Sequence, residues 1–121
     1  MYKRQLVYSS AFIEQNRDAA QRFMVAYMKG VRDYNDAMFK DVDKQDVVSI
    51  MAEKSGQPAD VVGRANPAAL DPNQTVSVDF LGRLQDWFRE SGAVQNPIDP
   101  AEMVDSSFAE FAVAQLGEYK S

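Results

Sequence analysis

The chain has 121 residues, of which 45% are hydrophobic and 26% are charged, and these proportions fit a globular domain rather than a disordered or fibrous chain. The formal net charge is -5 and the positive residues are scattered among acidic ones, so no nucleic-acid partner is predicted. There is no cysteine and no histidine, which excludes disulfides and thiol nucleophiles and removes the commonest general base and transition-metal ligand.

A short strand is predicted at the N-terminal end, from Arg4 to Ser9, because this run is rich in β-prone residues and partly alternates. Ser9 and Ser10 suit a turn or a helix cap, and one or two helical turns are expected from Ala11 to Gln15. A lone strand leaves its backbone groups unpaired. We therefore expect it to pair with another part of the same protein or with a second copy of the chain.

The most regular pattern predicts a long helix from Arg17 to Phe39, capped by Asn16. Its apolar residues recur at steps of three and four and form one stripe that is expected to be buried. The stripe consists of Ala20, Phe23, Met24, Tyr27, Met28, Val31, Tyr34 and Met38. We interpret its methionines as core residues rather than as an adaptable partner-binding groove.

Two shorter helices are predicted next. Asp43 can cap the first, from Lys44 to Ser55, and Gly56 follows it at the usual left-handed position. The residues expected to face the core are Val47, Ile50 and Met51. The second helix runs from Pro58 to about Ala65, and the Asn66-Pro67 pair ends it because a residue before proline avoids helical geometry.

A strongly amphipathic helix is predicted from Val78 to Ser91, capped by Ser77 and closed by Gly92. Its apolar face consists of Phe80, Leu81, Leu84, Trp87 and Phe88. Because Trp87 lies on this face, we interpret it as a core residue rather than as a site residue.

The last part of the chain contains a specific helix-start pattern, Asp99-Pro100-Ala101-Glu102. The final helix is expected to begin at Asp105 or Ser106 and to run to about Leu116. Its inward residues are Phe108, Phe111, Ala112 and Leu116. Residues 1–121 are thus predicted to be a single helical segment, with residues 1–10 as strand and turn and residues 117–121 as a flexible tail.

Three groups of polar residues are interpreted as structural or solvated rather than as binding or catalytic sites. Asp41, Asp43 and Asp46 crowd together, but Asp46 stands where a calcium loop needs glycine and Ala52 where it needs glutamate, so no metal site is predicted. The Asn73–Thr75 triplet fits a glycosylation acceptor and is interpreted as a turn. Scattered carboxylates such as Glu14, Asp18, Asp33, Asp36 and Glu110 are interpreted as solvated, and no cofactor is predicted.

The stretch from Leu6 to Asn16, running into Arg17–Phe23, resembles the solute-binding proteins of bacterial ABC importers for nitrate, sulfonates such as taurine, and pyrimidine precursors of thiamine. Arg17 stands where that family has a proline. Order and spacing agree over almost the whole chain, and further similarity lies at Gly30–Asp36, Leu84–Phe88, Gly92, Ile98–Asp99 and Val104–Asp105. The chain is similar to the C-terminal segment of those proteins.

The resemblance implies a mostly α fold with one short N-terminal strand, forming part of one lobe of an α/β periplasmic-binding-protein-like fold of type II. It implies capture of a small anion or small polar solute for an importer, with Ser9 and Ser10 as the ligand-binding candidates. The implied partners are the missing lobe of a longer protein, or a second copy paired through Arg4–Ser9, and the membrane permease. The isolated chain is expected to bind poorly, because one lobe cannot enclose a ligand.

The resemblance implies a periplasmic location if the segment belongs to an exported protein. No signal peptide is recognised in this chain. A related pyrimidine-synthesising enzyme depends on histidine, which this chain lacks, so no enzyme activity is expected. The alternative from a different class is a stand-alone helical protein that serves self-association or interaction with a partner.

Overall fold

The structure is a computed structural model that describes residues 6–120, and within these residues all regular structure is helical. The helices in chain order are α1 (Ser10–Gln15), α2 (Arg17–Lys40), α3 (Lys44–Ser55), α4 (Ala59–Arg64), α5 (Val78–Glu90), the 3-10 helix η1 (Pro100–Met103) and α6 (Ser107–Leu116). The described part of the chain is therefore a small all-α domain.

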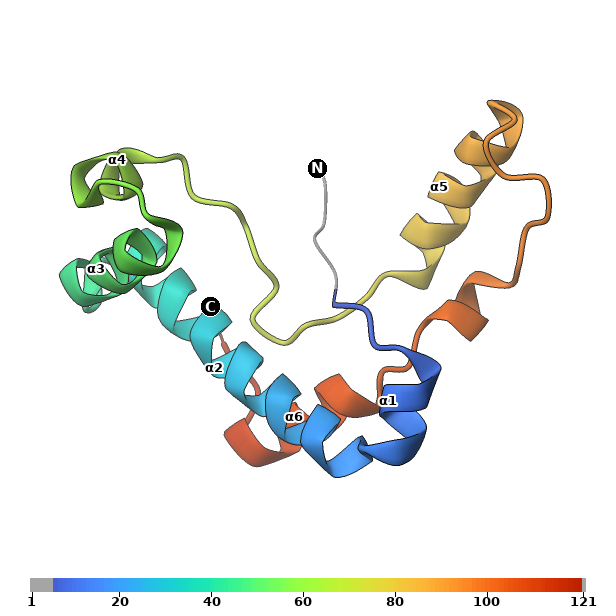
Figure 1. The fold of residues 1–121 in the computed structure, drawn as a ribbon, viewed down its shortest axis with the longest axis horizontal. Helices are drawn as coiled ribbons and strands as arrows, with labels where there is room; N and C mark the ends of the chain where they lie inside the picture. The colour runs from blue at the N-terminus through green and yellow to red at the C-terminus, as the bar shows by residue number, and fades with distance from the viewer. Residues whose placement is uncertain (1–5, 121) are drawn as a thin grey trace.

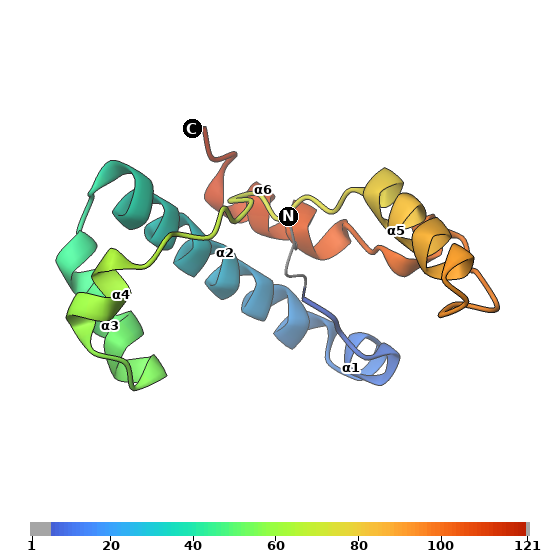
Figure 2. The ribbon, with the colours of Figure 1, turned by 90° about the horizontal axis from the view of Figure 1, so that it is seen from above.

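The helices are arranged as an open V (Figure 1). Helix α2 forms one limb, with α3 and α4 at its far end, and α5 with η1 forms the other limb. Figure 2 shows that α6 lies alongside α2 near the base of the V. Residues 65–77 have no helix and run through the open side of the V from α4 to α5.

The core lies where α2 packs against α6. Ala20, Met24 and Met28 occupy successive turns of α2 and bury one stripe against Phe108 and Ala112 of α6. The predicted stripe is confirmed at these α2 positions. Phe23, also predicted to be buried, is 49% exposed, because it lies at the edge of the stripe where α6 does not cover it.

The N-terminal segment packs on this core through aromatic side chains. The Tyr8 ring meets the Phe108 ring edge-on at 5.1 Å between centroids, and the Tyr8 hydroxyl donates a hydrogen bond to the Ala20 carbonyl at 3.0 Å. Phe12 and Ile13 of α1 are half-buried against the same cluster, as predicted. The segment before α1 is thus anchored by side chains and not by backbone pairing.

At the other end of α2, the helices α3 and α4 form a smaller packed unit around Val48 and Val62. Gly56 ends α3 with a φ of 68°, which confirms the predicted left-handed position. Ile50, predicted to face the core, is 58% exposed, because α4 covers the Val48 side of the helix. Asp43 precedes α3 as predicted, yet its side chain makes no capping hydrogen bond.

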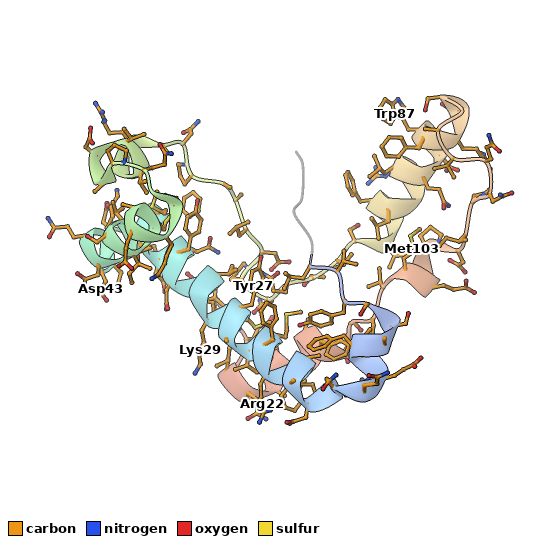
Figure 3. The ribbon with its side chains drawn as sticks, viewed as in Figure 1. Arg22, Tyr27, Lys29, Asp43, Trp87 and Met103 are labelled. Carbon is orange, nitrogen blue, oxygen red and sulfur yellow. The ribbon has the colours of Figure 1, made fainter. Side chains whose placement is uncertain are left out.

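The second limb stands apart from the core. Among the described helices, α5 packs only against η1, where the Gln85 amide exchanges two hydrogen bonds with the Ile98 backbone at 2.9 and 3.0 Å. The Ser77 hydroxyl caps α5 by accepting from the Phe80 amide at 3.2 Å, as predicted. Trp87 is 60% exposed and lies at the outer end of the limb (Figure 3), so its interpretation as a core residue is wrong.

The predicted N-terminal strand is not observed. Arg4 and Gln5 lie outside the described residues, and residues 6–9 are extended without strand pairing, because the described chain offers no other strand to pair with. The expectation of a lobe of an α/β periplasmic-binding-protein-like fold is therefore wrong for this chain. The helix-start pattern at Asp99 does act as predicted, but it starts the short 3-10 helix η1.

Candidate functional site

The two serines predicted to bind ligand lie at the start of α1, and both are exposed. The Ser9 hydroxyl oxygen accepts a hydrogen bond from the Phe12 amide at 3.2 Å and so caps the helix. Ser10 is the first residue of α1. The cap occupies one lone pair of Ser9, and the ligand-binding role of both serines stays a prediction.

The described chain has an open hollow of about 1130 Å³, which we call the groove. It lies between the N-terminal segment, α2, α6 and the segment from residue 69 to residue 76. Its lining is mostly apolar and includes Tyr8, Met24, Tyr27, Leu70, Val76 and Phe108. Tyr27 lies on the side of α2 that faces the hollow of the V (Figure 3).

The charged groups that line the groove are all carboxylates. They come from four places in the chain and are Asp71, Asp105, Glu110 and Glu118. The cations Arg22 and Lys29 lie on the opposite side of α2 (Figure 3), where they line a shallower hollow of about 320 Å³. The groove therefore favours neutral or positively charged solutes and disfavours anions.

Two groove groups have shifted ionisation. A hydrogen bond from Ser107 lowers the pKa of Asp105, so this carboxylate stays charged. Burial raises the pKa of Tyr8, so its phenol stays protonated and keeps its hydrogen bond to α2. The lining of the groove thus includes a charged carboxylate at Asp105 and a protonated phenol at Tyr8.

Arg32 of α2 joins the segment from residue 69 to residue 76, which we call the wall of the groove, to the end of α6. Its guanidinium donates to the Pro72 carbonyl at 3.1 Å and to the Asn73 amide oxygen at 3.0 Å. It also donates to the carbonyls of Leu116 at 3.4 Å and Gly117 at 2.7 Å. One positive side chain therefore satisfies backbone acceptors of two segments that are far apart in sequence.

The tail after α6 is held in the same place. The Asn73 side chain accepts from the Tyr119 amide at 3.0 Å and donates to the Tyr119 carbonyl at 3.2 Å. The Tyr119 hydroxyl donates to Asp36 and accepts from Lys40 at 2.8 Å. The predicted flexibility of residues 117–121 stays a prediction, and Tyr119 within that range makes four hydrogen bonds.

These contacts alter the ionisation of the α2 residues involved. The hydrogen bond from Tyr119, with that from Lys40, lowers the pKa of Asp36. The same tyrosine hydroxyl, followed by Asp36, raises the pKa of Lys40. Asp36 was predicted to be a solvated carboxylate, but it is tied to a residue 83 positions away.

The aspartate cluster and the Asn73–Thr75 triplet make contacts only with residues nearby in the sequence in the interactions described next. Within the described residues, no group of three or more potential ligands could hold a metal ion, and Asp41 is paired with Lys44 at 2.6 Å. Asn73 to Thr75 form a turn, in which the Asp71 carboxylate accepts from the amides of Asn73 at 2.8 Å and Thr75 at 3.0 Å. The turn interpretation is confirmed.

Arg32 and Tyr119 were not predicted as organising residues. Arg32 had no local signal, because its partners lie 40 to 85 residues away. Tyr119 had no signal, because its partners are separated from it by 46 to 83 residues.

In the described part of the chain, no helix is long and apolar enough to cross a membrane. Comparison with models of known protein families, with curated proteins and with solved structures finds no significant match to this chain.

Proposed function

We propose that this chain is part of a solute-binding protein that captures a small polar solute for an importer, and that the groove is its share of the binding site. The resemblance of Leu6–Phe23 and of the later motifs to the solute-binding family supports the class of function. The permease of an importer is the proposed partner, and the periplasm is the proposed location for an exported protein.

The observation that carries the proposal is the shape of the groove. Small-molecule sites usually enclose 300–1,000 Å³ and bury most of the ligand surface. The groove is large enough, at about 1130 Å³, but it is open on one side. We expect another part of the binding protein to cover it, so the isolated chain binds weakly.

The lining narrows the solute classes that the resemblance allows. Asp71, Asp105 and Glu110 offer acceptors to N–H groups and repel nitrate and sulfonate. Tyr8 and Tyr27 offer aromatic surface on which a flat ring can pack. A pyrimidine precursor that carries amino groups fits this combination better than an anion does.

Thermal melting of the purified chain with a panel of pyrimidines, nitrate, bicarbonate and sulfonates tests the proposal. A solute present at ten times its Kd stabilises the folded chain by about 1.4 kcal/mol. We expect a saturable rise in Tm with aminopyrimidines alone. A rise with anions only points to the hollow at Arg22 and Lys29 and contradicts the assignment of the groove.

Two variants localise the effect. Ala69 and Ala68 are adjacent exposed residues, but only Ala69 lines the groove. Ala69→Trp should reduce the rise in Tm by placing an indole ring in the groove, whereas Ala68→Trp should preserve the rise. Equal loss in both variants, or in neither, places the solute elsewhere.

Self-association is a second candidate function, and the exposed second limb favours it. Trp87 is 60% exposed and Phe88 37% exposed on the apolar face of α5, and Val7 before α1 is 89% exposed. Pairing of two copies through residues 4–9 stays a prediction. Sedimentation of wild type and Trp87→Ser tests this function: a dimer that the substitution dissociates supports it, and a monomer at all concentrations refutes it.

A further inference from the structure

The contacts made by Arg32, Asn73 and Tyr119, which we call the C-terminal clasp, link the tail to one wall of the groove. We propose that the clasp positions this wall, so that release of residues 117–119 loosens the segment from residue 69 to residue 76. The proposal concerns the geometry of the groove, and its consequence for ligand binding rests on the proposed function.

The wall has no regular structure of its own, so anchors from elsewhere must fix it. Helix α2 supplies two of them: the Asn35 amide donates to the Leu70 carbonyl at 2.9 Å, and Arg32 donates to the Pro72 carbonyl. The Asn35 contact lies at the start of the wall. Beyond it, the side chain of Asn73 depends on Arg32 and on the tail.

Asn73 is suited to this role because its amide group can donate and accept at once. The two hydrogen bonds with the Tyr119 backbone imitate the pairing of neighbouring strands, while Arg32 shares the same amide oxygen. Aspartate at this position can accept but not donate, and leucine can do neither. We therefore expect Asn73→Leu to weaken the clasp more than Asn73→Asp does.

The Tyr119 side chain fixes the tail to α2. Its hydroxyl lies between Asp36 and Lys40, one turn apart on α2, and the Lys40 ammonium also lies 4.6 Å from the ring centroid. In the same region, Arg32 donates hydrogen bonds to the carbonyls at the end of α6. The tail is thus bound to α2 at several points, and the wall is attached to the tail through Asn73.

Residue-resolved amide hydrogen exchange tests the clasp, because two hydrogen-bonded amides report on it separately. The Tyr119 amide donates to Asn73 and reports on the clasp, and the Thr75 amide donates to Asp71 and reports on the wall. In Asn73→Leu, we expect both amides to exchange at least about tenfold faster than in wild type. In Asn73→Asp, the Tyr119 amide should keep most of its protection.

The control is Asn66→Leu, which changes an exposed asparagine at the start of the same segment and should leave both amides unchanged. Amides of Met24 and Met28 in the core should keep their protection in every variant. Unchanged exchange at Thr75 in Asn73→Leu overturns the proposal, and so does an equal acceleration in the core, which indicates general destabilisation.

Solute binding separates this proposal from the proposed function. If Thr75 exchange accelerates in Asn73→Leu and aminopyrimidine raises the Tm of wild type, both proposals are supported. If Thr75 exchange accelerates but no solute binds wild type, the clasp stands and the assignment of the groove as a solute site fails.

Discussion

Replacement of Phe108 by alanine should remove a large share of the stability of the fold. Phe108 is 2% exposed, its ring meets Tyr8 edge-on, and the Arg17 guanidinium lies 4.9 Å from its centroid. Truncation of a buried phenylalanine costs about 3–5 kcal/mol through lost transfer energy and the cavity left behind. A chain of this length is typically stable by about 6–18 kcal/mol in total.

The matched control is Phe39→Ala near the end of α2, where the ring is 54% exposed. Partial burial and the absence of an enclosed cavity limit its cost to about 1 kcal/mol. Urea unfolding followed by helical circular dichroism gives both free energies, provided that the slope with urea is the same in each variant. Equal losses in the two variants refute packing of α6 on α2 as the source of stability.

Ser9→Ala should cost about 1 kcal/mol and accelerate exchange of the Phe12 amide, because the α1 cap is lost, and unchanged exchange contradicts the cap. Because Tyr119 and then Lys40 lower the pKa of Asp36, the stability that this carboxylate contributes is present above its ordinary pKa and is lost as pH falls through the lowered value. Urea unfolding of Asp36→Asn and wild type should therefore differ near pH 6, and the difference should shrink as pH falls below the ordinary pKa of Asp36; a constant difference contradicts the contact. Trp87, the single tryptophan, should emit at long wavelength and be quenched freely by acrylamide, and blue-shifted emission indicates that the second limb is covered.

The helices could be predicted where local chemistry fixes them. The three- and four-residue spacing around Met24 and Met28 places α2, the Ser77 hydroxyl starts α5, and Gly56 ends α3. Each of these signals acts within one or two turns of the chain. They are therefore readable without knowledge of the rest of the structure.

The remaining features depend on partners distant in sequence. Residues 6–9 of the β-prone run form no strand, since strand formation requires a second strand that the described chain does not supply. The apolar face of α5 was visible in the pattern, but the pattern does not say what covers it, and Trp87 is exposed. The clasp joins Arg32 to residues 40 to 85 positions away, and no local spacing encodes such a contact.

The clasp holds the wall of the groove, and the carboxylates of the groove set the proposed solute class. Nuclear magnetic resonance titration of the isotopically labelled chain with aminopyrimidine, nitrate and sulfonate tests the groove as a binding site most directly. We expect saturable shifts at groove amides such as Tyr27, Thr75 and Ala109 with aminopyrimidine and none there with the anions. Shifts confined to residues outside the groove, or no shift with any solute at high concentration, contradict the groove as a binding site.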